Sequence, residues 1–315
     1  MSASSSPAIV CEAIHKSYGD VRAVENLSLT VPTGAVYGFL GPNGSGKTTS
    51  IRMMVAILLP DSGQIHIHGL PVGDHTKDQI GYLPEERGLY QKMKVGEQLE
   101  FLAELKRVPK SEAKGRVTRW LERVELGAWA DKKVNDLSKG MQQKIQFIAA
   151  VIADPPILIL DEFSSGLDPV NANLLNDILL EQRAKGKTIL LSTHRMEEAE
   201  RLCDHVCLIN KGHKVLDGRL SDLRAATGKS TLRVDYTGDP AILRQAPGVA
   251  SAEDFGNYAE LKLRPDAQSP QSVAEIMRFL APRLVITRFE QLEPSLNQIF
   301  LDTVASTSVP ASASA

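Results

Sequence analysis

The sequence has few cysteines, no long apolar run and no excess of charge of one sign. Its three cysteines, Cys11, Cys203 and Cys207, are an odd number that is too sparse for a disulfide scaffold, which favours a protein that works inside the cell. The spacing Cys203-x-His205-x-Cys207 could suggest a metal site, but fewer than four plausible ligands converge there. We interpret it as a helix end followed by the buried strand 206–209.

Membrane and nucleic-acid signals are also missing. No stretch approaches the roughly 18 consecutive apolar residues that a membrane-spanning helix needs, and residues 1–7 lack the charged and apolar regions of a signal peptide. If the protein works at a membrane, another chain must supply the spanning part. The formal net charge of -2 and the absence of a long basic run argue against a nucleic-acid partner.

What is present is typical of a globular protein with one large and one small domain. The chain has 315 residues, of which 43% are hydrophobic and 23% charged. The Ser/Ala/Pro-rich ends, residues 1–7 and 306–315, are expected to be disordered. A change of pattern near residue 224 predicts a boundary between a domain over 8–223 and a smaller one over 224–305.

The larger domain shows an α/β pattern. Residues 9–31 alternate apolar and polar side chains around a turn at 19–20, which predicts antiparallel strands. Helical periodicity over about 93–153 predicts a helical subdomain. The remaining expected elements are strands at 35–40, 157–160 and 188–192 and helices at 47–59 and 171–185. Continuous apolar strands that alternate with helices predict a mostly parallel sheet covered on both faces.

The smaller domain is predicted to be a small α+β module, possibly ferredoxin-like. Its expected elements are a strand at 231–236, a helix at 240–245, a strand at 260–263, a helix at 272–280, a strand at 285–289 and a final helix at 295–304.

The run from Gly41 to Thr48 matches the phosphate-loop pattern G-x-x-x-x-G-K-[ST] in full. Glycines allow successive backbone N–H groups to turn toward phosphate oxygens, and the following helix adds its positive end. Lys47 would reach the β- and γ-phosphates, while the Thr48 hydroxyl could bind magnesium. The predicted ATP-binding residues here are Gly41, Pro42, Asn43, Gly44, Ser45, Gly46, Lys47, Thr48 and Thr49. A Rossmann site is excluded, because no G-x-G-x-x-G follows a strand.

Four further segments follow the loop in order. Residues 157–162 place two acids, Asp161 and Glu162, after a buried strand, although such a pair could also merely cap the strand end. Residues 137–142 open a helix for which Ser138 is a plausible N-cap. The other two segments are 165–169 and 192–194, the second ending in His194.

Together these motifs resemble those of the ATP-binding-cassette (ABC) ATPases over residues 9–223. The resemblance implies a P-loop NTPase fold that binds ATP and Mg²⁺. Asp161 would hold the metal, Glu162 would act as general base and His194 as the switch histidine. The signature residues would be Ser138, Lys139, Gly140 and Met141, the D-loop residue Asp168, and the aromatic that stacks on adenine Tyr18.

The same resemblance implies two such subunits packed head to tail, with each signature helix facing its partner's ATP. Two positions depart from the family pattern. Glu85 stands where the family has a glutamine that contacts magnesium, and a carboxylate can still serve as a metal ligand. Lys139 and Met141 depart from the usual LSGGQ signature, and Met141 removes a side-chain hydrogen bond.

Residues 83–90 and the C-terminal module resemble a narrower group, the ATP-binding subunits of sodium- and drug-export bacterial transporters. That resemblance implies an exporter subunit on the inner face of the cell membrane that works with a separately encoded permease. The alternatives are a soluble ABC ATPase in translation, repair or cofactor assembly, and a non-hydrolysing regulatory cassette. A single cassette argues against a translation ATPase, and the lack of sustained heptads argues against a repair ATPase. A cofactor-assembly ATPase stays open, although the C-terminal module argues mildly against it. Glu162 and His194 argue against the regulatory cassette.

Overall fold

The computed structural model describes residues 6–86, 88–228 and 230–307. Backbone contacts divide the chain into two compact units, residues up to 218 and residues from 219 onward. This division lies a few residues before the boundary expected near 224, which falls inside helix α7 (Leu220–Thr227). The helix belongs to the second unit because it contacts α9 (Leu296–Thr307) there. In the part of the chain that the structure describes, no helix has the length and apolarity to cross a bilayer.

A six-stranded sheet forms the centre of the first unit. Its order is β10-β9-β3-β8-β7-β6, and the pairs from β9 to β6 are parallel. The strands are β3 (Val36–Leu40), β6 (Ile80–Leu83), β7 (Ile157–Asp161), β8 (Thr188–Thr193), β9 (His205–Asn210) and β10 (His213–Arg219). Strands β3, β7 and β8 are buried along their whole length, as their continuous apolar runs predict.

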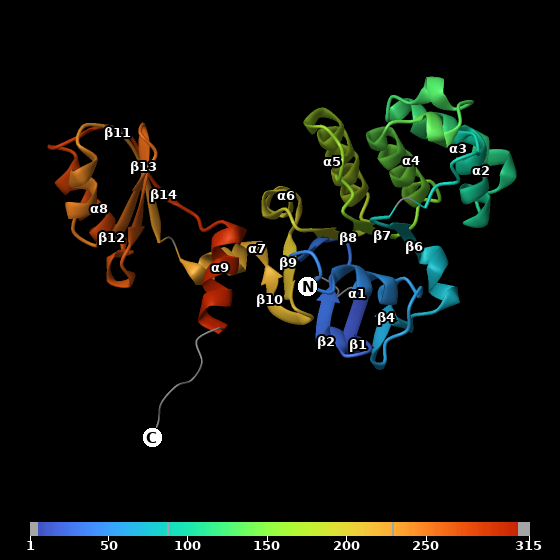
Figure 1. Ribbon diagram of the computed structural model, residues 1–315, viewed down its shortest axis with the longest axis horizontal. Coiled ribbons are helices and arrows are strands. Elements are labelled where there is room, and N and C mark those ends of the chain that lie inside the picture. The colour runs from blue at the N-terminus through green and yellow to red at the C-terminus, as the bar shows by residue number, and fades with distance from the viewer. Residues whose placement is uncertain (1–5, 87, 229, 308–315) are drawn as a thin grey trace. The chain divides into compact units, whose positions relative to one another are not determined.

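A second, antiparallel sheet covers one face of the first. Its order is β2-β1-β4-β5, with β1 (Ile9–Tyr18), β2 (Val21–Val31), β4 (Ser62–Ile67) and β5 (Leu70–Pro71). Helix α1 (Lys47–Met54) lies on the same side of the central sheet in Figure 1. Ile51, Met53 and Met54 of α1 belong to a core cluster that also contains residues of both sheets. This packing holds the start of α1 beside the end of β3.

Helix α1 is shorter than the expected helix over 47–59. Ala56 adopts a left-handed conformation (φ 56°), and the Leu58 N–H donates to the Arg52 carbonyl, so the chain reverses after Met54. A short 3-10 turn, η1 (Asp74–Gln79), precedes β6.

The helices on the other face of the central sheet include the predicted helical subdomain. This subdomain contains α2 (Val95–Leu105), α3 (Lys110–Arg123), η2 (Gly127–Trp129), η3 (Val134–Asp136) and α4 (Lys139–Val151). Helix α5 (Pro169–Ala184) lies beside α4 above the sheet in Figure 1, and α6 (Met196–Leu202) follows β8. The segments 137–142 and 165–169, which the sequence marks as functional, therefore include the first residues of α4 and α5.

The second unit is an antiparallel sheet of order β12-β13-β11-β14 with one long helix packed on its buried face. Its elements after α7 are β11 (Thr231–Thr237), η4 (Pro240–Gln245), β12 (Val249–Asp254), β13 (Tyr258–Leu263), η5 (Pro265–Ala267), α8 (Pro270–Leu280), β14 (Val285–Leu292) and α9. The strand-helix-strand-strand-helix-strand order from β11 to β14 is that of a ferredoxin-like module.

Three expectations for this unit need correction. Strand β12 was not predicted, because four of its six side chains are exposed and no apolar alternation marks it. The helix expected at 240–245 is a 3-10 helix. Helix α9 also continues into the tail expected to be disordered from 306, ending at Thr307. The remainder of that tail and residues 1–5 lie outside the described residues.

Candidate functional site

The predicted phosphate loop connects β3 to α1, and two of its glycines are required by close backbone contacts. Gly41 and Gly46 have φ values of 153° and 104°. A Cβ atom at position 41 would lie 2.3 Å from the Ile209 carbonyl oxygen, and one at position 46 would lie 2.3 Å from the Ala23 carbonyl oxygen. Only glycine fits both conditions. The loop therefore presents the N-terminal, positive end of α1 to the space in front of it.

The Lys47 ammonium lies inside this loop. Its Nζ donates to the carbonyl oxygens of Gly41 (2.7 Å) and Pro42 (3.1 Å), and only 6% of the residue is exposed. Burial lowers the pKa of Lys47, and the carboxylates of Glu162, Asp161 and Glu85 oppose that shift. The lysine is therefore a buried cation surrounded by acids, placed where a phosphate group could bind to it.

A pocket of about 540 Å³ opens in front of the loop. Eight predicted residues line it: Asn43, Gly44, Gly46, Lys47, Thr48, Thr49, Glu85 and Glu162. Four lining residues were not predicted: Val21, Arg22 and Ala23 at the start of β2, and Lys211 after β9. Tyr18 is not among the lining residues and is 51% exposed, so its stacking on adenine remains a prediction.

Three oxygen-bearing side chains, Thr48, Glu85 and Asp161, lie close together, and the first two line the pocket. The Thr48 hydroxyl donates to Glu85 Oε2 at 3.4 Å. Asp161, at the end of β7, is fully buried, and its two carboxylate oxygens have no hydrogen-bond partner among the described residues. Burial raises the pKa of Asp161. A buried carboxylate without partners beside a hydroxyl and a second carboxylate fits a hard divalent cation such as Mg²⁺.

Glu162 and His194 form a pair at the ends of β7 and β8. The His194 Nδ1 and Glu162 Oε1 atoms lie 2.8 Å apart. Glu162 has a left-handed backbone conformation (φ 50°), and its N–H donates to the Ser192 carbonyl at 3.0 Å. Non-glycine residues seldom adopt this conformation, which tends to occur at functional sites. The backbone thus directs a mostly buried glutamate into the pocket.

The signature and D-loop residues lie at helix starts. Ser138 is the N-cap of α4, where its hydroxyl accepts from the Met141 N–H at 3.2 Å. Asp168 caps α5 by accepting from the N–H groups of Val170 and Asn171, and these hydrogen bonds hold its pKa below the usual range. Gly140 lies close to the D-loop, because a Cβ there would be 3.4 Å from Leu167 Cδ2.

None of the four signature residues, Ser138, Lys139, Gly140 and Met141, is among the described residues that line the pocket at Lys47. Within one chain they therefore do not reach a nucleotide bound there.

Sequence reasoning missed two glutamines that connect α4 to the site. Gln143 Nε2 donates to the Phe163 carbonyl at 2.9 Å, directly after Glu162. Gln146 Nε2 donates to the Glu86 carbonyl at 3.2 Å, directly after Glu85. Both are buried on a helix face whose sequence pattern is that of core packing, so no sequence signal distinguishes them from core residues. Through them α4 contacts both acidic segments.

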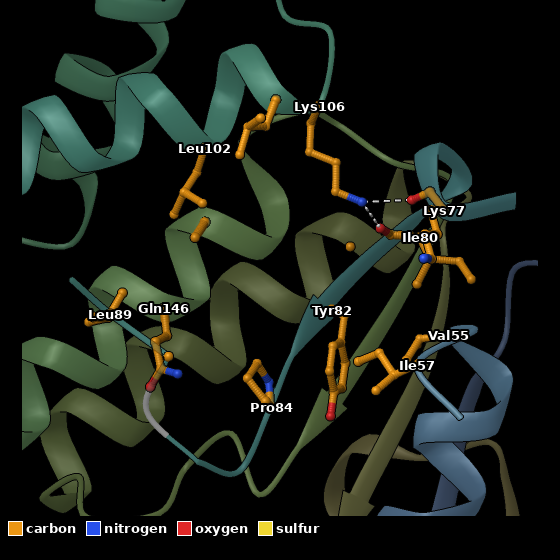
Figure 2. A pocket seen from close by; sticks show the side chains of 14 residues that line it. Val55, Ile57, Lys77, Ile80, Tyr82, Pro84, Leu89, Leu102, Lys106 and Gln146 are labelled. Carbon is orange, nitrogen blue, oxygen red and sulfur yellow. Dashed lines mark hydrogen bonds between the residues drawn. The ribbon is translucent and has the colours of Figure 1, made fainter. Parts of the chain in front are cut away.

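A second pocket of about 370 Å³ lies between the edge strand β6 and helices α2 and α4 (Figure 2). We call it the β6 groove. Its lining is mostly apolar and consists of Val55, Ile57, Lys77, Ile80, Gly81, Tyr82, Pro84, Gly88, Leu89, Leu102, Leu105, Lys106, Gln146 and Ala149. At one end Lys106 Nζ donates to the carbonyls of Lys77 (2.6 Å) and Ile80 (3.1 Å). Pro84 is part of the lining, and the next residue in the chain is Glu85.

A parallel sheet with a phosphate loop after β3, an acidic pair after β7 and a histidine after β8 defines a P-loop nucleoside triphosphatase. Residues 24–165 match the family model described as "ABC transporter", and residues 218–304 match the C-terminal domain of "ATP-binding protein DrrA1-3-like". The uncharacterized ABC transporter ATP-binding protein YhaQ of Bacillus subtilis (strain 168) is 41% identical over 94% of this chain and 98% of its own length. The chain belongs to the ABC transporter ATP-binding family, and its larger unit is an ABC ATPase domain.

Other comparisons agree with this assignment. The Nod factor export ATP-binding protein I of Rhizobium meliloti (strain 1021) is 40% identical over 93% of this chain and 87% of its own length. A solved ATP-binding subunit of an ABC transporter superposes with a TM-score of 0.66 at 30% identity, covering 70% of this chain and 93% of that one. The dimeric post-hydrolysis cassette MJ0796 gives a TM-score of 0.63 at 24% identity over 67% and 98%, which shows the shared fold.

Proposed function

We propose that this chain is the ATP-hydrolysing subunit of an exporter, and that it couples ATP-driven closure of a homodimer to a separate membrane permease. The main support is that Lys47 and Glu162 line one pocket at the end of the parallel sheet, with His194 in contact with Glu162. The named function of the Rhizobium meliloti relative, Nod factor export, supports export as the direction. In this account the subunit lies on the inner face of the cell membrane, held there by the permease.

Different site residues would bind the phosphates, hold the metal ion and activate the attacking water. The loop N–H groups and Lys47 bind the phosphates, while Thr48, Asp161 and Glu85 would hold Mg²⁺. The ion supplies charge neutralisation at the phosphates when it is bound. Glu162 accepts the proton of the water that attacks the γ-phosphorus, and His194 orients the Glu162 carboxylate through their 2.8 Å contact. A buried, held carboxylate is well placed for that role because its orientation is fixed before the water arrives.

The signature residues support a head-to-tail homodimer. Ser138 and Gly140 begin a helix whose N-terminus is positive, yet they do not line their own chain's pocket. The ATP of a second copy is the anion that suits this helix start. Asp168, at the start of α5, would lie in the same interface.

The β6 groove is the surface that we assign to the permease. Ile57 and Leu105 line it and are 62% and 61% exposed, and exposed apolar side chains that gather in one groove are typical of an interaction surface. Pro84 lines the groove and the next residue, Glu85, lines the ATP pocket, so an occupant would contact the segment that bears a site residue. The segment that would bind in the groove is a short amphipathic helix on an inner loop of the permease.

Leu105→Glu is expected to abolish permease binding while it leaves the ATP affinity of the isolated chain unchanged. The charge is placed in the apolar lining and does not reach the ATP pocket. The measurement is recovery of a candidate permease, a polytopic membrane protein coexpressed with this chain and captured in detergent. Leu70→Glu is the matched control, since Leu70 is 47% exposed on β5 and outside the groove. Equal recovery with both variants would rule out the groove as the docking surface.

The alternative of a soluble ABC ATPase without a permease makes a different prediction. Such a protein would be recovered from cells with soluble partners alone, even when membranes are solubilised with mild detergent. Recovery with a polytopic membrane protein, lost in Leu105→Glu, favours the transporter subunit.

A further inference from the structure

Negative charge is concentrated at the phosphate end of the ATP pocket. Three carboxylates, those of Asp161, Glu162 and Glu85, act on the buried ammonium of Lys47. Two other cations line the pocket, Arg22 and Lys211, and Arg22 is already paired with Glu25 at 2.6 Å. A nucleoside triphosphate without a metal brings several more negative charges to this end. Its terminal phosphates would lie beside the three carboxylates that act on Lys47.

Glu85 is the acid whose effect depends most on a cation. Glu162 is held by His194 at 2.8 Å, and Asp161 is fully buried at the end of β7. Glu85 instead is exposed, lines the pocket, and has its Oε2 atom 3.4 Å from the Thr48 hydroxyl. The next residue, Glu86, pairs with Arg52 at 3.3 Å and does not line the pocket. One of two adjacent glutamates is thus directed at the phosphate end.

We propose that Glu85 makes this cassette select the divalent-cation complex of the nucleoside triphosphate over the free anion. The inference rests on the proposed function. Without a cation, the Glu85 carboxylate repels the terminal phosphates across the pocket. With a cation beside Thr48 and Asp161, the same carboxylate becomes an additional hard oxygen ligand. A neutral amide at this position would weaken both effects and thus the selectivity.

The test is equilibrium binding of a non-hydrolysable ATP analogue, measured by titration calorimetry with excess Mg²⁺ and with EDTA at constant ionic strength. Wild-type protein is expected to bind at least about tenfold more tightly with Mg²⁺, because one more charge a few ångströms away contributes on the order of a kcal/mol or more, equivalent to about tenfold. In Glu85→Gln the ratio of the two affinities is expected to fall by about tenfold, chiefly because binding in EDTA becomes tighter.

Glu86→Gln is the matched control, since it removes a neighbouring charge that faces Arg52, and its affinity ratio should equal that of wild type. Both glutamates are exposed, so neither variant is expected to unfold. An unchanged ratio in Glu85→Gln, or an equal change in Glu86→Gln, would overturn the selection role while ATP binding itself stands. Wild-type protein that binds the analogue in neither condition would overturn the proposed function as well.

Discussion

Replacing Glu162 by glutamine is expected to lower the rate of ATP hydrolysis by about 10²–10⁴-fold, the usual contribution of a general base. The amide keeps the size of the side chain but cannot accept the proton of the attacking water. Lys47 and the loop glycines are untouched, so ATP should still bind. Phosphate release by purified protein in the presence of Mg²⁺ measures the effect.

The Glu162→Gln variant should also accumulate as an ATP-bound dimer, because hydrolysis is the step that reopens the pair in the proposed cycle. Light scattering with and without ATP detects this change in mass. Glu122→Gln, an exposed glutamate on α3 outside the pocket, is the control and should behave as wild type. A Glu162→Gln rate equal to that of wild type would remove Glu162 from the chemistry.

Replacing Lys47 by alanine is expected to weaken ATP binding by about 10²-fold or more. The ammonium is the buried cation of the phosphate loop, and a hydrogen bond to a charged group contributes about 1.5–3 kcal/mol. The loss should appear in the dissociation constant for ATP, measured by calorimetry, and hydrolysis should fall with it.

Lys187→Ala separates this effect from the general cost of losing a buried lysine. Lys187 is 7% exposed, pairs with Asp154 and does not line the ATP pocket. Its variant is expected to bind ATP as wild type does, even if its unfolding temperature falls. Similar ATP affinities for Lys47→Ala and wild type would place the nucleotide elsewhere.

Continuous apolar runs and motifs with fixed spacing made much of the ATPase unit predictable. Strands β7 and β8 are buried along their whole length, and each contains a continuous apolar run, 157–160 and 189–191. The phosphate loop carries its own glycine pattern. Strand β12 could not be predicted in the same way. Its partners in the sheet stabilise it, while its own side chains are mostly exposed.

The site was predictable only where a residue belongs to a local motif. Lys211 reaches the pocket because the Gly212 N–H donates to the Ser45 carbonyl at 2.9 Å, a contact between segments far apart in the chain. Gln143 and Gln146 contact the acidic segments from a helix whose pattern is that of core packing. The 3.4 Å approach of Thr48 to Glu85 likewise depends on the parallel sheet, which brings both loops to one edge.

This chain is expected to hydrolyse ATP and, by doing so, to drive transport by a membrane permease. The most direct test is Mg²⁺-dependent phosphate release by the purified chain, alone and in lipid vesicles with a candidate permease. We predict release that disappears in EDTA and rises when the permease is present. A chain that binds ATP yet releases no phosphate in either setting would contradict the account and indicate a regulatory cassette.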